Sequence, residues 1–210
     1  MKKNYIEILT KKFAEKTAEE IIKNTEESCV YKKVSGSAIV FLILYVDDIL
    51  LIGNDVTFLT EVKESLKKRF SMKDLGEAAY ILGIKIYRDR SRRLIALCQD
   101  TYLEKVLKRF KMEDSKKGSL PTLSGKPLSK KQCPTTVAER EYMSSVPYAS
   151  AIGSIMYAMI CTRLDVSYAL SVTSRYQSDP GKDHWTAVKT ILKYLRRTKD
   201  MFLVYGGDKE

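Results

Sequence analysis

The sequence is poor in the residues that build many metal and hydrolytic sites. It has a single histidine, His184, which excludes sites made from several histidines and disfavours a Ser-His-Asp hydrolase. No two cysteines form a Cys-x-x-Cys pair, so neither a zinc module nor a disulfide framework is expected, and a reducing compartment is favoured. The four cysteines are Cys29, Cys98, Cys133 and Cys161.

The patterns of a signal peptide and of a membrane span are also missing. The glutamates Glu7, Glu15, Glu19 and Glu20 interrupt the apolar core that a signal peptide requires after its basic start. The apolar run at 38–52 is short for a transmembrane helix and carries two carboxylates near its centre. We therefore expect a cytoplasmic or nuclear protein without a membrane partner.

Positive charge is what the sequence has in excess. Lysine and arginine number 37 against 26 acidic residues, a formal net charge of +11 over 210 residues. This balance favours a polyanionic partner, of which nucleic acid is the commonest, although a merely basic soluble protein is the plainer alternative. The length suits one large domain or two modest ones.

Two adjacent aspartates, Asp47 and Asp48, interrupt the apolar residues of 37–53. A carboxylate in an apolar setting loses several kcal/mol or shifts its pKa unless it is compensated, and two neighbours also repel each other. A divalent cation such as Mg²⁺ would remove both problems, because it prefers oxygen ligands and cancels the paired charge. The alternative is a solvated hairpin turn, where aspartate is common.

The spacing of apolar residues predicts an α+β half up to about residue 112 and a helical half beyond about residue 140. Between them, residues 113–140 are rich in proline, glycine, lysine and serine and predict a polar linker. Helices are expected at 4–24, 56–70, 100–111, 147–161, 165–177 and 182–197. Strands are expected at 28–33, 38–46, 49–52, 79–88, 93–98 and 201–205.

The motif Tyr45-Val46-Asp47-Asp48 between two apolar strands resembles the catalytic hairpin of reverse transcriptases. An ordered series of further stretches narrows the resemblance to the reverse transcriptase of copia-type LTR retrotransposons and extends it over roughly residues 26–206. These stretches are 44–55, 70–77, 80–84, 99–102, 147–157, 161–165, 180–185 and 191–196. One small departure is Arg163-Leu164-Asp165, where the family usually has Arg-Pro-Asp.

The resemblance implies an α+β fold: a partial polymerase palm, with the YVDD hairpin in an antiparallel sheet plus helices, followed by a mostly helical thumb and connection. On this basis we expect an amphipathic helix unlike the family at 1–25, a partial palm at 26–112, the polar linker at 113–140 and the thumb-like region at 141–206.

The resemblance also implies the site. Asp47 and Asp48 match two of the three carboxylates that hold paired Mg²⁺ (or Mn²⁺) ions in a polymerase. Leu82-Gly83 matches part of the primer grip, and Tyr45, beside the aspartates in the motif, is expected to contact the nucleic acid as well. Lys73 occupies a region where polymerases carry a lysine for the leaving group, although an exposed surface lysine is the plainer interpretation. The partner implied is an RNA/DNA template-primer duplex.

The departures from the family pattern concern the catalytic site. The 46 residues before Asp47 contain no aspartate, whereas the family carries its first metal-binding aspartate on an earlier palm strand. Nothing in the chain matches the fingers or the RNase H domain. The leading hypothesis is therefore a truncated reverse transcriptase, inactive alone and at most a template-primer binder, in which the metal is not held because the third carboxylate is missing.

Three alternatives stay open. The chain is an active polymerase completed by a partner chain or by dimerisation, a non-enzymatic nucleic-acid-binding module, or a remnant without selected activity. Self-association through the exposed palm surface is a further expectation, because missing partner strands would leave a sheet edge open.

Overall fold

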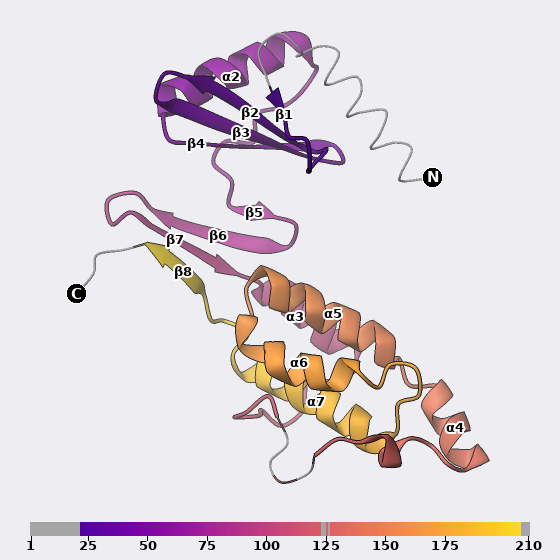
Figure 1. The fold of residues 1–210 in the computed structure, drawn as a ribbon. Helices are drawn as coiled ribbons and strands as arrows, with labels where there is room; N and C mark the ends of the chain where they lie inside the picture. Colours follow the sequence, from indigo (N-terminus) through magenta and orange to yellow (C-terminus); the bar gives the residue numbers. More distant parts are fainter. Residues whose placement is uncertain (1–21, 123–124, 126, 207–210) are drawn as a thin grey trace. The chain divides into compact units, whose positions relative to one another are not determined.

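The computed structural model describes residues 22–122, 125 and 127–206, which fold into two compact units divided between Ala78 and Ala79; unit 1 precedes this boundary and unit 2 follows it. Both are mixtures of antiparallel sheet and helix, so the α+β expectation holds at this level, with six helices among the described residues (Figure 1). The division between Ala78 and Ala79 falls inside the stretch 26–112 that we expected to form one region.

Unit 1 is a four-stranded antiparallel sheet with one helix packed on it. The strands follow the order β1-β2-β3-β4, and helix α2 contacts β3 and β4. Their bounds are β1 (Ile22–Lys23), β2 (Val30–Ser35), β3 (Ala38–Tyr45), β4 (Asp48–Gly53) and α2 (Val56–Arg69). The expected helix at 4–24 lies outside the described residues except at its end, where Ile22 and Lys23 pair with β2 as a strand instead.

The long apolar run forms strand β3, whose side chains alternate between two faces of the sheet. Val40 and Leu42 are buried with Tyr31 of β2 and with three residues of α2, namely Phe58, Val62 and Leu66. Phe41 and Tyr45, on the opposite face, are 41% and 50% exposed. Both faces of this strand are therefore apolar, which explains why its sequence shows no polar alternation.

Local signals fix the start of α2. The side chain of Asp55 accepts a hydrogen bond of 2.7 Å from the backbone N–H of Phe58, as an N-cap does. Gly53 ends β4 where no larger residue fits, because a Cβ there would lie 2.8 Å from the carbonyl oxygen of Ile39.

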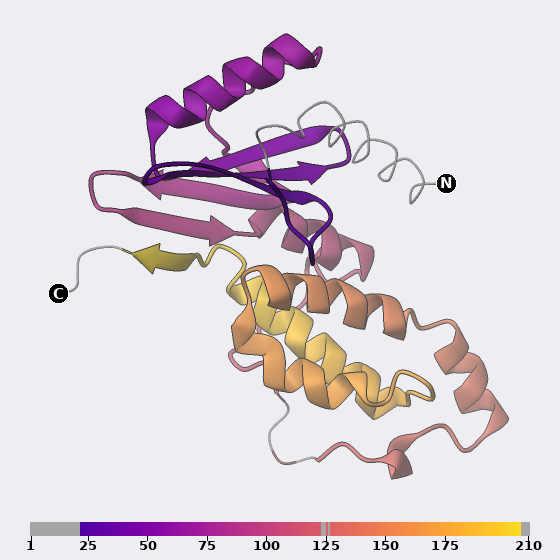
Figure 2. The same cartoon turned by 45° about the horizontal axis from the view of Figure 1, so that its top comes forward.

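Unit 2 contains a second four-stranded antiparallel sheet, in the order β5-β6-β7-β8. Its strands are β5 (Tyr80–Ile81), β6 (Ile84–Asp89), β7 (Leu94–Cys98) and β8 (Leu203–Gly206). The single strand expected at 79–88 is in fact a hairpin, because Leu82 and Gly83 form a tight turn between β5 and β6. Strand β8 comes from the far end of the chain and pairs with β7, although all the helices of unit 2 lie between these two strands in the sequence (Figure 2).

The helices of unit 2 share one apolar core. It is built mainly from one face each of α3 (Asp100–Arg109), α5 (Tyr148–Cys161), α6 (Ser167–Ser174) and α7 (Lys182–Arg197). Fully buried members from these helices include Leu103, Ile155, Leu170 and Ile191. Helix α5 is apolar along most of its length, and helix α7 keeps its lysines and arginines off the core.

The polar segment expected at 113–140 packs on α7 where it is described. The N–H of Gly118 donates to the carbonyl of Lys193 at 3.0 Å, and the ring of His184 contacts the carbonyl of Ser129. A short 3-10 helix, η1 (Lys130–Gln132), and the start of α4 (Val137–Ser144) fall in the same stretch. Thr136 caps α4 through the N–H of Glu139, which explains why a helix begins before residue 140.

No single helix of the described residues is long and apolar enough to cross a membrane, although α4 and α5, bent by 46° at their junction, pass that test as a pair.

Candidate functional site

The Asp pair lies at the tip of the β3–β4 hairpin in unit 1. Tyr45 and Asp48 are the last paired residues, and Val46 and Asp47 form the two-residue loop between them. The backbone of Val46 has φ +54°, in the left-handed region. A β-branched residue is a true outlier there, and strained backbone of this kind tends to cluster at functional sites.

Both carboxylates are exposed, as is Tyr45 beside them. The desolvation cost that the apolar sequence context suggested is therefore not incurred, because the hairpin carries the pair out of the sheet into solvent. Carboxylate oxygens are the ligands that Mg²⁺ prefers. Within the described residues, however, no three His, Cys, Asp or Glu side chains come together as a metal site, so the pair lacks a third ligand.

Lys73 lies in the irregular segment after α2, and its side chain is exposed. Its neighbour Asp74 holds this segment, with ion pairs to Lys63 at 3.1 Å and Lys67 at 3.4 Å. A hydrogen bond from the N–H of Gly76, helped by these lysines, lowers the pKa of Asp74. The contacts therefore order the segment next to Lys73.

Leu82 and Gly83 belong to unit 2. They form the two-residue turn between β5 and β6, with φ +53° and +78°. Two positive φ values are typical of a type I′ turn, which favours asparagine and glycine, so leucine is out of place by local preference. The side chain of Leu82 is 44% exposed, and its carbonyl accepts a 2.5 Å hydrogen bond from the phenol of Tyr157 on α5.

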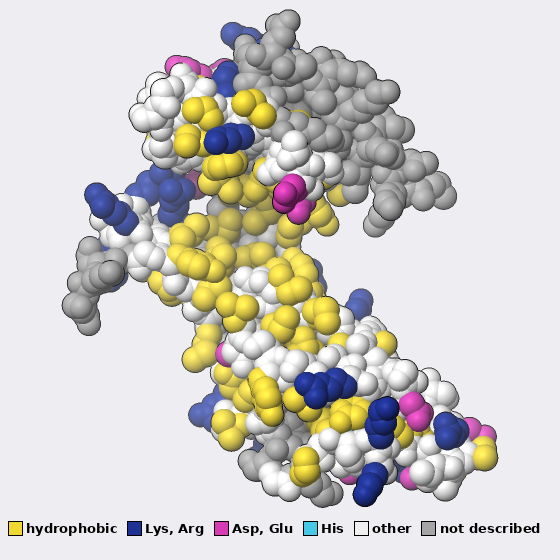
Figure 3. Space-filling view, in the orientation of Figure 1, with side chains coloured by type: hydrophobic (Ala, Val, Ile, Leu, Met, Phe, Trp, Pro, Cys, Tyr) yellow, Lys and Arg dark blue, Asp and Glu magenta, His cyan; other side chains and the backbone are white. Residues whose placement is uncertain are grey.

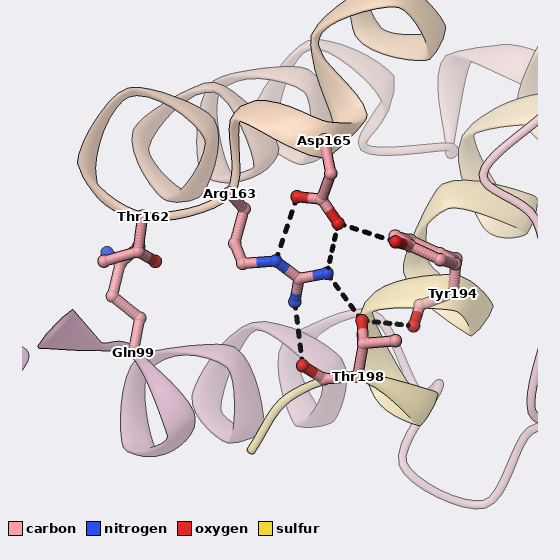
Figure 4. Close-up of polar contacts among 6 residues, drawn as sticks. All are labelled: Gln99, Thr162, Arg163, Asp165, Tyr194 and Thr198. Atoms are coloured by element: carbon pink, nitrogen blue, oxygen red, sulfur yellow. Dashed lines mark hydrogen bonds and ion pairs between the residues drawn. The ribbon is translucent and has the colours of Figure 1, made fainter. Parts of the chain in front are cut away.

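A polar network centred on the buried guanidinium of Arg163 lies at the C-terminal end of α5 (Figure 4). The guanidinium of Arg163, 4% exposed, donates to Asp165 at 2.7 and 3.1 Å and to the carbonyl of Thr198 at 3.0 Å. The phenol of Tyr194 also donates to Asp165, at 2.7 Å. Burial alone would raise the pKa of Asp165, but the hydrogen bonds from Arg163 and Tyr194 outweigh it, and the pKa lies below its usual range.

Among the tyrosines on the helices of unit 2, Tyr157 lies beside a residue of the expected site, whereas Tyr148 and Tyr194 have other partners. Tyr148 is a core residue, since it is 3% exposed and its phenol donates to the carbonyl of Thr173. Tyr194 belongs to the Arg163 network, and Tyr157 contacts the Leu82–Gly83 turn. Sequence spacing gives no signal for these partners, which come from distant parts of the chain.

Residues 4–124 match the family described as Reverse transcriptase (RNA-dependent DNA polymerase). The chain is 49% identical over 187 residues to the Retrovirus-related Pol polyprotein from transposon TNT 1-94 of Nicotiana tabacum, covering 89% of this chain and 14% of that protein. It is 31% identical over 188 residues to the Retrovirus-related Pol polyprotein from transposon RE2 of Arabidopsis thaliana, covering 89% and 12%. The Putative transposon Ty5-1 protein YCL074W of Saccharomyces cerevisiae is 28% identical over 184 residues, covering 88% and 58%.

No solved structure matches the chain. The chain spans 12–14% of the length of the two polyproteins. The family match begins at residue 4, so it includes most of the segment 1–25 that the motifs left outside the resemblance, and it contains both the Asp pair and the Leu82–Gly83 turn.

Proposed function

This chain belongs to the reverse transcriptase (RNA-dependent DNA polymerase) family, in its copia-type retrotransposon branch, and we propose that it is the part of such an enzyme that presents the YVDD hairpin and holds a template-primer duplex. In this proposal unit 1 is part of the palm. Asp47 and Asp48 supply two of three catalytic carboxylates, and the helices of unit 2 act as thumb and connection. By itself the chain does not polymerise.

The observation that carries this proposal is the geometry of the hairpin tip. Two exposed carboxylates stand there on a strained turn, which suits a site that meets a metal and a nucleotide from solvent. They would hold Mg²⁺ or Mn²⁺, which when bound neutralises the charge of a triphosphate. The third ligand is lacking among the described residues, so we expect the pair to hold an ion weakly.

Exposed basic side chains support the duplex-binding role. Four exposed arginines lie within a short stretch in and beside the turn that joins β6 to β7. Figure 3 shows basic side chains at this end of the hairpin and over the helices of unit 2. Arginine and lysine bind phosphates without reading base sequence, which a polymerase requires. These arginines are Arg88, Arg90, Arg92 and Arg93.

The decisive experiment is primer extension by the purified chain, with an RNA template, a DNA primer and Mg²⁺ or Mn²⁺, beside Asp47→Asn. We expect no extension from either protein and equal binding of the duplex by both. The affinity should fall steeply with salt, with a log–log slope set by the number of phosphates contacted. Failure of the folded chain to bind the duplex at low salt would refute the proposal.

A second candidate is an active polymerase completed by another polypeptide segment. The open edge of β4 favours it, because β4 pairs only with β3 among the described residues. A strand carrying the third carboxylate could add beside β4, next to Asp48, as strands add to open sheet edges in other proteins. Extension that is lost in Asp47→Asn would establish this candidate in place of the first.

A further inference from the structure

The turn formed by Leu82 and Gly83 rests on two tyrosines of unit 2. Tyr157 of α5 donates its phenol hydrogen to the carbonyl oxygen of Leu82 at 2.5 Å. Tyr102 of α3 lies near Gly83, because a Cβ added to this glycine would lie 3.8 Å from the Tyr102 Cβ. Tyr102 follows Leu82 by about twenty residues and Tyr157 follows it by about seventy-five, so two distant helices contact the same two-residue turn.

The two tyrosines also hold each other in place. Their rings meet edge to face, with centroids 4.9 Å apart and planes inclined at 69°. The phenol of Tyr102 donates to the carbonyl of Ser154, one turn before Tyr157 on α5, at 3.0 Å. The hydroxyl of Tyr157 therefore has little freedom, so the carbonyl that it binds is held at a defined place.

Leu82 is the unexpected member of this arrangement. A leucine at φ +53° is strained, and a glycine or an asparagine would form the same turn more easily. The side chain gains little burial in return, because it is 44% exposed. Strain without a packing benefit points to a side chain that is presented to a ligand, and the hydrogen bond from Tyr157 then serves to set where it is presented.

We propose that Tyr157 is a positioning residue: through its hydrogen bond to the Leu82 carbonyl it fixes the β5–β6 turn on α5, so that the exposed Leu82 side chain meets the end of the primer strand at a set place. This inference rests on the proposed function for its ligand. The contact between Tyr157 and the turn is independent of that function and is tested separately.

The test compares Tyr157→Phe with Tyr102→Phe in the full chain. Both changes remove one phenolic oxygen from the same tyrosine pair, but only the first removes a hydrogen bond to the turn. The first readout is amide hydrogen exchange at residues 81–86. We expect it to rise about fivefold in Tyr157→Phe, as the loss of one neutral hydrogen bond allows, and to rise clearly less in Tyr102→Phe, which keeps the hydrogen bond from Tyr157 to Leu82.

The second readout is the end preference, defined as the Kd for a blunt RNA–DNA hybrid divided by the Kd for a hybrid of equal duplex length with a recessed primer 3′ end. Fluorescence anisotropy should show the end preference falling several-fold in Tyr157→Phe, with the Kd for the blunt hybrid unchanged. Leu82→Gly should lose the end preference as well while folding at least as well as the parent chain, because glycine suits this turn.

The outcomes separate the two proposals. Unchanged exchange at 81–86 in Tyr157→Phe would refute the positioning contact. Raised exchange with an unaltered end preference would show that the turn does not place the primer. A parent chain that binds neither hybrid overturns the proposed function and, with it, the role of Tyr157 in primer placement.

Discussion

Val46 and Leu82 hold backbone angles that glycine adopts more readily, with φ +54° and +53°. They belong to the two motifs that the family resemblance singles out, the YVDD hairpin and the turn matched to the primer grip. Arg93 and Lys111, the other described non-glycine residues with positive φ, lie in ordinary turns that end a hairpin and a helix. Local strain of about 1–2 kcal/mol per residue is therefore present in both motifs.

Replacing Val46 by glycine should stabilise unit 1. The left-handed strain of a β-branched residue outweighs the extra backbone entropy that glycine loses on folding, and the net gain should be about 1 kcal/mol. Urea unfolding of the two chains measures it. Gly36→Ala is the matched control, since Gly36 has φ +57° with open space around it, and that change should destabilise by a similar amount. A destabilised Val46→Gly would mean that the turn is not strained.

His184 is a fully buried residue at the start of α7. Its Nδ1 accepts a 2.9 Å hydrogen bond from the N–H of Gly181, so the proton lies on Nε2, which donates to the carbonyl of Ser129 at 3.1 Å. Tyr176 stacks on the ring at 3.9 Å. Burial lowers the pKa of His184, although the Ser129 carbonyl and the nearby carboxylates of Asp183 and Asp179 act in the opposite direction.

This arrangement predicts a loss of stability in mild acid. Because the folded pKa lies below the unfolded one, the contribution of His184 is fully present above about pH 6.5 and is lost as the pH falls through the unfolded and then the folded pKa. Denaturant unfolding between pH 7.5 and 5.5 should show this slope in the parent chain. His184→Asn should be less stable at pH 7.5 and show a flatter profile, and an equal slope in both would assign the effect to other groups.

At the scale of elements, Arg163 joins three pieces of unit 2. It follows helix α5, pairs with Asp165 in the 3-10 helix η2 (Leu164–Val166) and donates to Thr198 at the end of α7. Thr198 is the C-cap of α7, and its carbonyl accepts hydrogen bonds from both the guanidinium of Arg163 and the N–H of Met201. A planar donor with several N–H groups is required for this geometry.

Arg163→Lys should therefore destabilise unit 2 by about 2 kcal/mol, because an ammonium group cannot bind Asp165 and Thr198 in the same way. Arg163→Met should cost more, since it removes every hydrogen bond of the guanidinium to Asp165 and Thr198. Thermal unfolding measures both. Arg140→Lys is the control: Arg140 makes an exposed ion pair with Asp179 at 3.7 Å, and its replacement should change little. Equal effects at the two positions would contradict the role given to Arg163.

At the scale of the whole molecule, each unit has a hydrophobic core of its own. The core of unit 1 is centred on Val40 and Leu42, and the core of unit 2 on α3, α5, α6 and α7. Neither cluster includes described residues of the other unit. Two separate cores favour two unfolding transitions.

Calorimetry of the full chain should resolve these transitions. Leu42→Ala should lower the free energy of unfolding of unit 1 by about 2–5 kcal/mol, because it leaves a cavity in that core. Ile191→Ala should lower the free energy of unfolding of unit 2 by a similar amount for the same reason. Leu120→Ala, at a residue that is 57% exposed, should affect neither. A chain without any cooperative transition would support the interpretation of this protein as a remnant without a packed fold.

Local sequence patterns determined most of the secondary structure of this protein, its family and the kind of partner that we propose for it. The apolar spacing predicted most helices and strands of both units to within a few residues, because those segments carry their own periodicity, caps and turns. The Tyr45–Asp48 motif and the stretches around it determined the family. The excess of lysine and arginine determined the kind of partner that we propose.

Only the tertiary structure decided the features that depend on residues far apart in the sequence. It placed Asp47 and Asp48 in solvent at a hairpin tip, and it divided 79–88 into two strands at a turn held by Tyr157. It packed the polar segment on α7 through His184 and added β8 to β7. These contacts have no sequence signature, because a phenol, an imidazole or a strand edge can meet any backbone carbonyl that the fold brings within reach.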